Sequence, residues 1–294
     1  MDTQKLLILS TVRDDYGRIY SIQKTNEQRA AVRLNLTATR LWGSCRGLIL
    51  IGDQELANPT TCYSRKLKQA PRGDYNRVFK AYGIGYDTIL DDYVVVAISY
   101  YQCSTYQKES FFYVFALKTG KWERALLSPY DHRMSRDYAG VLFQGGWHWF
   151  AKSGDLLVLV VFNVSSRSLA SVPKPENLTF EDGTFSFPEI GVLDDCLSVV
   201  AIKGGKETFI WLMRSYGVAE TWFNLVIRHP VSQISALYMR EESWNVICVE
   251  DGNFLLLIVS ENGGVRIQDF AVHGLPEDFE VGLLTDDSLI SPFQ

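Results

Sequence analysis

Four pairs of adjacent aspartates are the residues of this sequence best suited to general acid–base chemistry. They are Asp14-Asp15, Asp91-Asp92, Asp194-Asp195 and Asp286-Asp287. Two carboxyl groups can share acid and base roles, as in glycoside hydrolysis, when a fold holds them on either side of one bond. Each pair, however, lies where an apolar run meets a polar segment, and aspartate is a common turn residue. We therefore interpret all four pairs as turn caps.

The histidines give no clear catalytic or metal-binding pattern either. His132, His148, His229 and His273 are far apart in the sequence, and His148 lies between two tryptophans in an alternating strand pattern, which favours a structural role. The sequence contains no G-x-S-x-G elbow, H-E-x-x-H pair or Walker loop. "KTGKW" (Lys118–Trp122) resembles the Asp-box of sialidase-like glycosidases but lacks its leading Ser-x-Asp. We predict a protein without catalytic activity, cofactor or metal; a sialidase-like glycoside hydrolase is the enzyme alternative.

Composition narrows the class of partner. The chain has 294 residues, 47% of them hydrophobic, with a formal net charge of −5. This balance predicts a large core and argues against a general nucleic-acid or anionic-membrane binder, because both need a basic face. Five cysteines without a C-x-x-C pair favour scattered reduced thiols. With no signal peptide or membrane span in the sequence, we expect a location in the cytoplasm or nucleus.

The apolar runs are short, rich in β-branched and aromatic residues, and separated by turn residues, which predicts an all-β fold. Runs such as "VFALKTGKW" and "VFNVSSRSL" have the same layout: a strand, a polar turn and the start of a second strand. Equivalent positions begin at 19, 56, 114, 161, 210 and 257. Spacings close to 47 residues fall within the range of propeller repeats.

A second motif has the same period. Short strands with a central glycine precede these hairpins, as in "RLWGSC", "YGIGYD", "YAGVLF" and "EIGVLD", and one more strand follows each of them. Each unit is therefore expected to contain four strands. The N-terminal unit lacks its leading strand, and "FEVGLL" (Phe279–Leu284) would supply it and close the ring. We predict a single-domain, six-bladed, kelch-like β-propeller over residues 1–294.

"IWLMRSYGVAETWFNLVI" (Ile210–Ile227) is the stretch that tests this prediction. Taken alone, its tryptophans fit either an amphipathic helix or two strands joined by a turn. The repeat favours an outer hairpin that turns at Arg214–Glu220, with Trp211 and Trp222 packed between neighbouring blades.

The same segments resemble a known family. "WGSCRGLILI" (Trp42–Ile51), "ANPTT" (Ala57–Thr61), "YGIGYDTILDDYVVVAI" (Tyr82–Ile98) and "YVFALKTGKWER" (Tyr113–Arg124) are similar to the F-box-associated domain (type 1) of plant F-box proteins, a group that includes S-locus and F-box/kelch-like members. "GVLFQGGWHWFA", "VVFNVSSRSLASVPKP", "IGVLDDCLSVV" and the Ile210–Ile227 stretch resemble later landmarks in the same order. The resemblance runs from about Leu6 to Ile227.

This resemblance implies the substrate-recognition domain of an SCF-type E3 ubiquitin ligase receptor, which is a non-catalytic protein-binding module. Its partners would be a target protein for ubiquitination and, through an F-box, the Skp adaptor and cullin. No Leu-Pro-led F-box precedes Lys5, so we expect ligase assembly only if an F-box is present upstream. The alternative binding function is a carbohydrate-binding propeller, with exposed aromatic rings beside Asp and Asn in a pocket.

The partner-binding residues are expected in loops at one end of the ring. The longest insertion, Ser64–Gly83, carries six basic residues against one acidic residue, with Tyr75 and Phe79 among them, and could anchor an acidic protein surface. The segments 103–110 and 128–138 are the next candidates because they offer Tyr, His and Arg. The predicted contact residues are Arg65, Lys66, Lys68, Arg72, Tyr75, Arg77, Tyr106, Tyr130, His132 and Arg136.

Overall fold

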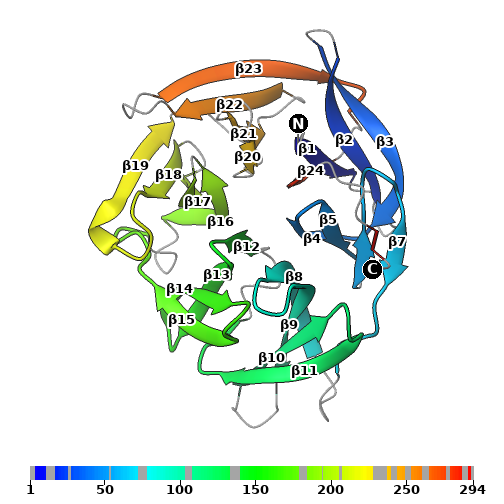
Figure 1. Ribbon diagram of the computed structural model, residues 1–294. Coiled ribbons are helices and arrows are strands. Elements are labelled where there is room, and N and C mark those ends of the chain that lie inside the picture. The colour runs from blue at the N-terminus through cyan, green and yellow to red at the C-terminus, as the bar shows by residue number, and fades with distance from the viewer. Residues whose placement is uncertain are drawn as a thin grey trace.

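The strands form sheets arranged in a ring (Figure 1). The computed structural model describes residues 4–10, 17–25, 28–52, 54–71, 78–102, 108–132, 140–178, 184–193, 195–204, 207–227, 237–239, 244–248, 253–259, 265–275, 279–286 and 291–292. Within these residues the only helix is a single 3₁₀ turn, η2 (Ala219–Thr221), and none is long and apolar enough to cross a membrane. The prediction of an all-β propeller is confirmed.

Four of the sheets have four antiparallel strands each, paired in chain order. The first contains β4 (Leu41–Cys45), β5 (Leu48–Ile51), β6 (Glu55–Ala57) and β7 (Ser64–Lys66). The second contains β8 (Val78–Asp87), β9 (Asp92–Gln102), β10 (Lys108–Ala116) and β11 (Lys121–Ser128). The third contains β12 (Val141–Phe143), β13 (Gly146–Ser153), β14 (Leu156–Asn163) and β15 (Ser168–Val172). The fourth contains β16 (Phe185–Leu193), β17 (Cys196–Lys203), β18 (Glu207–Met213) and β19 (Trp222–Ile227).

The remaining eight strands form one sheet in the order β20-β21-β22-β23-β3-β2-β1-β24. They are β1 (Gln4–Ser10), β2 (Gly17–Thr25), β3 (Gln28–Ala38), β20 (Leu237–Met239), β21 (Trp244–Cys248), β22 (Asn253–Val259), β23 (Val265–His273) and β24 (Phe279–Asp286). β24 pairs antiparallel with β1, from Gln4 opposite Asp286 to Ser10 opposite Phe279. The predicted closure of the N-terminal blade by a C-terminal strand is therefore confirmed.

The sequence predicts six separate blades, but the structure has five sheets, so this prediction is wrong. β23 pairs in parallel with β3, with Val272 opposite Arg29 and His273 opposite Ala30. This short pairing joins two sets of four antiparallel strands into the eight-stranded sheet. The rim strands β3 and β23 meet because the backbone groups of an unpaired edge strand bond readily to a neighbouring strand. All six repeat positions nevertheless fall in the third strand of a four-stranded set.

The core lies between neighbouring sheets. Strands β4, β8, β12, β16, β20 and β24 surround the centre of the ring, and β3, β7, β11, β15, β19 and β23 lie at its rim (Figure 1). One cluster joins side chains of three successive sheets, including Leu50, Phe115 and Phe162, and each of these is at most 1% exposed. Face-to-face burial of this kind is the main stabilising term in a propeller of short strands.

The glycines of the inner strands make room for one large side chain. Trp147 on β13 is buried, and its indole N–H donates to the carbonyl of Ile84 at 2.8 Å. A Cβ atom added at Gly83 would lie 2.3 Å from the Trp147 ring, and one added at Gly43 would lie 2.6 Å from it. The central glycine of the repeat therefore permits close packing between successive sheets.

The stretch Ile210–Ile227 is a hairpin, as the repeat predicts. β18 pairs with β19 from Thr208 opposite Ile227 to Met213 opposite Trp222. Trp211 is buried beside Phe185 of the same sheet and Phe150 of the preceding one. The Trp222 indole donates to the carbonyl of Pro173 at 3.0 Å. Both tryptophans therefore pack where the third and fourth four-stranded sheets meet.

Candidate partner-binding face

One end of the ring is built from tight turns, and we call it the turn face. In an antiparallel sheet the first and third hairpins turn at the same end. The turn face therefore gathers the segments between β4 and β5, β6 and β7, β8 and β9, β10 and β11, β12 and β13, β14 and β15, β16 and β17, and β18 and β19. Polar side chains cap these turns: Asn58 accepts from the N–H groups of Thr60 and Thr61, and Asn163 from those of Ser165 and Ser166.

Exposed hydrophobic side chains concentrate on this face. Nine large hydrophobic side chains of the described residues are exposed, and five of them lie in these turns. The five are Tyr63, Ile89, Leu90, Tyr216 and Val218. Ile89 is 75% exposed at the tip of the β8–β9 turn, whereas Leu156, 68% exposed, follows the β13–β14 turn at the opposite end. Hydrophobic side chains that gather on one exposed face can mark a surface that binds another protein.

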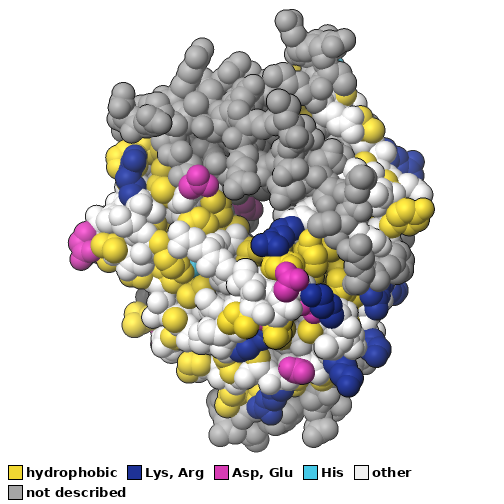
Figure 2. Space-filling model, viewed as in Figure 1, with side chains coloured by type: hydrophobic (Ala, Val, Ile, Leu, Met, Phe, Trp, Pro, Cys, Tyr) yellow, Lys and Arg dark blue, Asp and Glu magenta, His cyan; other side chains and the backbone are white. Residues whose placement is uncertain are grey.

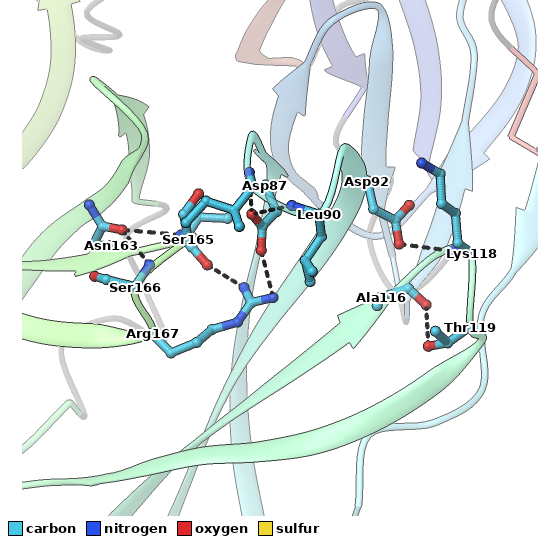
Figure 3. Close-up of polar contacts among 12 residues, drawn as sticks. Asp87, Leu90, Asp92, Ala116, Lys118, Thr119, Asn163, Ser165, Ser166 and Arg167 are labelled. Atoms are coloured by element: carbon cyan, nitrogen blue, oxygen red, sulfur yellow. Dashed lines mark hydrogen bonds and ion pairs between the residues drawn. The ribbon is translucent and has the colours of Figure 1, made fainter.

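A partly buried ion pair joins two turns of this face. Asp87 at the end of β8 accepts from the N–H groups of Ile89 and Leu90, at 3.0 and 3.1 Å. Its other carboxylate oxygen accepts from Arg167 Nη2 at 2.9 Å, across the boundary between two sheets (Figure 3). The Asp87 side chain is 1% exposed and that of Arg167 26%. This pair fixes the turn that carries Ile89 and Leu90.

A second, exposed network surrounds Asp91. The Tyr86 hydroxyl donates to Asp91 Oδ1, a bond that raises the pKa of Tyr86 and lowers that of Asp91. Lys118 Nζ lies 3.5 Å from Asp91 Oδ2 and also donates to the Asp91 carbonyl. The Arg46 guanidinium lies 3.7 Å from the centre of the Tyr86 ring.

The face viewed in Figure 2 is hollowed near its centre, and basic side chains lie there beside acidic and hydrophobic ones.

The β18–β19 turn is attached to the neighbouring sheet through a buried histidine. His148 is 0% exposed, and its Nδ1 lies 3.0 Å from the carbonyl of Gly146. Its Nε2 lies 2.7 Å from the Tyr216 hydroxyl, so Nδ1–H donates to Gly146 and Nε2 accepts from Tyr216. Burial lowers the pKa of His148 to about 4. The neutral ring therefore has the structural role that the sequence pattern indicates.

Of the described aspartates of the predicted pairs, Asp91 and Asp195 lie in turns, Asp92 begins β9 and Asp286 ends β24. Asp92 Oδ2 accepts from the N–H of Lys118 at 3.0 Å, and Asp91 takes part in the network described above. Asp92 is buried, whereas the sequence predicts only that it caps a turn. Asp14, Asp15, Asp194 and Asp287 lie outside the described residues. Within the part of the chain that the structure describes, no group of three or more His, Cys, Asp or Glu side chains could hold a metal ion.

The predicted insertion Ser64–Gly83 is shorter than the sequence suggests. Ser64–Lys66 is strand β7 and Val78–Gly83 is the first part of β8, so only 67–77 connects the two sheets. Of the predicted contact residues in this segment, Arg65, Lys66 and Lys68 line one hollow, together with Lys118 from the β10–β11 turn. Four basic side chains from two sheets therefore surround one site.

Two other predicted contact residues have a different outcome. His132 is 0% exposed, so its assignment to a partner surface is wrong. Its Nδ1 accepts from the Trp149 indole at 2.8 Å, its Nε2 lies 2.6 Å from Ser128 Oγ, and burial lowers its pKa to about 4. Tyr130 is half-buried, and its N–H donates to Ser128 Oγ at 3.1 Å. The predicted contacts Arg72, Tyr75, Arg77, Tyr106 and Arg136 lie outside the described residues.

The aliphatic tip of the β8–β9 turn is not among the contact residues predicted from the sequence. Ile89 and Leu90 stand between Asp87 and Asp92 in "DTILDD", and a turn normally carries polar residues at such positions. The presence of two large aliphatic residues in a turn bounded by aspartates is the sequence feature that indicates an exposed hydrophobic tip. Lys118 was also missed as a site residue, because its proximity to Arg65 and Lys68 depends on the packing of two sheets.

Comparisons with solved structures support the fold alone. The structure of TolB from Acinetobacter baumannii superposes with a TM-score of 0.58 and 11% sequence identity, covering 97% of this chain and 66% of that one. At that level of identity the similarity concerns the arrangement of strands and says nothing of the site.

Curated relatives share sequence as well. The F-box protein CPR1 of Arabidopsis thaliana is 29% identical over 229 residues, which cover 69% of this chain and 55% of the relative. The F-box protein At4g22390 of the same plant is 26% identical over 250 residues, covering 76% of this chain and 60% of the relative. The chain thus spans a little over half the length of these relatives.

A family model supplies the assignment. The model described as "F-box associated beta propeller domain" matches residues 5–187, which is more than half of the chain and includes the turns that carry Ile89, Lys118 and Arg167. The match agrees with the resemblance that the motifs indicate and with the ring of sheets. This chain belongs to the family of F-box associated β-propeller domains.

Proposed function

We propose that residues 1–294 form a single module that recognises the target protein of an SCF-type E3 ubiquitin ligase receptor. The family and its F-box relatives support this role, and an F-box located upstream would recruit the Skp adaptor and cullin. We place the module in the cytoplasm or nucleus, in keeping with the free thiols of Cys45, Cys62 and Cys196.

The observation that carries the proposal is the exposed aliphatic tip of the turn face. Ile89 and Leu90 are 75% and 57% exposed, yet their backbone N–H groups are held by the buried Asp87 carboxylate. A rigid apolar projection loses little conformational entropy on binding and can enter a pocket on a partner. Charged side chains surround it, as in the polar rim of an interface.

The area available suits a specific complex. Stable protein–protein interfaces bury about 800 Å² on each partner. The exposed hydrophobic side chains of the turn face come from the first, second and fourth four-stranded sheets. The third sheet, which stands between the second and the fourth, contributes Arg167. A target that covers these turns would contact several sheets at once, and each sheet would contribute part of the specificity.

A capture experiment tests this role. The full chain, immobilised, is compared with an Ile89→Asp, Leu90→Asp double variant in capture from plant extract, with quantitative mass spectrometry as the readout. Leu156→Asp is the matched control, because the exposure of Leu156 lies between those of Ile89 and Leu90 and the residue is at the opposite end of the ring. We expect a defined set of proteins to be lost by the double variant and retained by the control.

The ligase role needs a second measurement. The chain placed in frame behind an F-box should promote ubiquitination of a captured protein in a reconstituted reaction, and the double variant should not. Capture of the same proteins by all three forms would remove the turn face from the proposal. Capture that depends on Ile89 and Leu90 without ubiquitination would limit the function to protein binding.

A further inference from the structure

A basic hollow of about 500 Å³ opens between strand β7 and the β10–β11 turn. Arg65, Lys66, Lys68 and Lys118 line it, and none of the lining residues that the structure describes is acidic. The chain as a whole carries a net charge of −5, so four cations around one hollow are a strong local departure from its average. Such a concentration of positive charge attracts anionic groups.

Two of these cations have no carboxylate partner in the part of the chain that the structure describes. Lys118 pairs with Asp91 at 3.5 Å, and Lys66 lies opposite Glu55 in the β6–β7 pairing. Among the described residues, no acidic side chain lies within ion-pair distance of Arg65 or Lys68. The described residues therefore compensate the positive charge of the hollow only in part, and Arg65 and Lys68 supply the part that remains.

The backbone beneath the basic residues is held in place from two sides. The N–H of Leu67 donates to the Gln54 carbonyl at 2.8 Å, and the N–H of Ala70 donates to Gln54 Oε1 at 2.7 Å. The indole of Trp122 donates to the Lys68 carbonyl at 2.7 Å. A site whose backbone is already fixed loses less entropy when a ligand binds, so these bonds favour a binding function.

Part of the lining of the hollow is apolar. Leu67 and Phe115 line it, and both are buried, with Phe115 only 1% exposed. An apolar wall lowers the local polarisability, so charges at the rim interact with an anion more strongly than they would in open solvent. The guanidinium of Arg65 can bind two oxygens of one group, which a phosphoryl group presents and a single chloride does not.

We propose that this hollow binds the phosphoryl group of a phosphorylated segment of the target protein. The inference rests on the proposed recognition function and adds phosphorylation as a requirement for it. A phosphorylated side chain carries about −1.5 to −2 charges at neutral pH, which suits the uncompensated Arg65 and Lys68. Lys118 contacts Asp91, the residue that follows Leu90, so one bound segment can reach both the hollow and the aliphatic tip.

The test uses an array of degenerate peptides with a fixed central phosphoserine, printed beside the same peptides with serine. The full chain should bind the phosphoserine peptides at least about tenfold more strongly. An Arg65→Gln, Lys68→Gln double variant should lose this preference. Arg18→Gln with Arg33→Gln is the matched control, because it removes two positive charges from exposed positions on β2 and β3 and should keep the preference.

Two further arms identify the source of the anion. Inorganic phosphate should compete with the phosphoserine peptides, and added salt should weaken their binding. Vesicles of phosphatidylcholine with phosphatidylserine are the membrane arm. Binding to these vesicles that requires Arg65 and Lys68, without a preference for phosphoserine, would overturn the proposal in favour of a lipid surface.

Other outcomes separate this inference from the recognition function. Equal binding of phosphoserine and serine peptides, binding of neither, or an unchanged preference in the double variant would each overturn the proposal. The capture experiment with Ile89→Asp and Leu90→Asp would still stand or fall separately. Treatment of the extract with phosphatase should abolish capture if both inferences hold, and unchanged capture would overturn only the phosphoryl site.

Discussion

The guanidinium of Arg167 lies 2.9 Å from the carboxylate of Asp87, and the two residues are 80 positions apart in the chain. Arg167 follows β14 and Asp87 ends β8, so the pair joins turns of two neighbouring sheets (Figure 3). The aliphatic tip that we propose as the main contact lies in the turn that Asp87 caps. The binding surface and the boundary between sheets therefore depend on the same ion pair.

Loss of Arg167 should destabilise the protein. Arg167→Met leaves the Asp87 carboxylate, which is 1% exposed, with only two N–H donors, and leaving a buried charge without its partner costs about 3 kcal/mol. The free energy of unfolding in urea measures this loss. Lys118→Gln is the control, because the Lys118–Asp91 pair is exposed and its removal should leave the midpoint unchanged. Equal effects of the two variants would contradict the assignment of a buried, stabilising pair.

A methyl group at Gly83 should disturb the packing of Trp147. Gly83→Ala places a Cβ atom 2.3 Å from the indole, whereas the Cβ atom of Gly85→Ala would lie 3.0 Å from its nearest neighbour, a methyl group of Val164. We expect Gly83→Ala to lower the free energy of unfolding by about 2 kcal/mol and Gly85→Ala to lower it less. Adding Trp147→Leu should make the combined loss smaller than the sum of the two. Strict additivity would show that the two residues do not contact each other.

Stability should fall in mild acid because of the two buried histidines. Burial lowers the pKa of His132 and His148 from 6.5 to about 4, so between these values the unfolded chain binds protons that the folded chain does not. The free energy of unfolding should decrease as pH falls through this window, by about 1 kcal/mol per pH unit for each histidine. It should be insensitive to these two groups above pH 6.5.

Urea midpoints across this window measure the effect. His148→Gln keeps a donor for Gly146 and an acceptor for Tyr216 but removes the titration, so the dependence on pH should become shallower. His273→Gln is the control, because His273 is exposed on β23. An unchanged pH dependence in the His148 variant would show that this ring is protonated equally in both states.

The indole of Trp122 should matter for the basic hollow beyond its effect on stability. Trp122→Phe keeps an aromatic ring next to Phe115 but removes the N–H bond to the Lys68 carbonyl, at a cost of about 1 kcal/mol in stability. Binding of a phosphoserine peptide should weaken as well. Trp222→Phe removes a similar bond, to Pro173, and should lower stability without affecting peptide binding. Equal peptide binding by both variants would contradict the role of Trp122 in positioning Lys68.

Much of the fold is readable from local patterns. The six repeat positions fall in third strands, the glycine-centred runs supply inner strands, and Phe279–Leu284 belongs to the closing strand. The number of separate sheets was not predictable, because the parallel contact of Val272 with Arg29 depends on where two rim strands meet in space. The burial of His132 was missed for a similar reason, since its partner Trp149 comes from another sheet.

The sequence by itself determined the strands, their turns and the family, because alternation, turn residues and repeat spacing are properties of neighbouring residues. Only the tertiary structure decided which turns share a surface. It brings Lys118 to Arg65 and Lys68, and Arg167 to Asp87, across boundaries between sheets. The physical reason is that buried hydrophobic area fixes how the sheets pack, and this packing sets every distance between polar groups that are far apart in the chain.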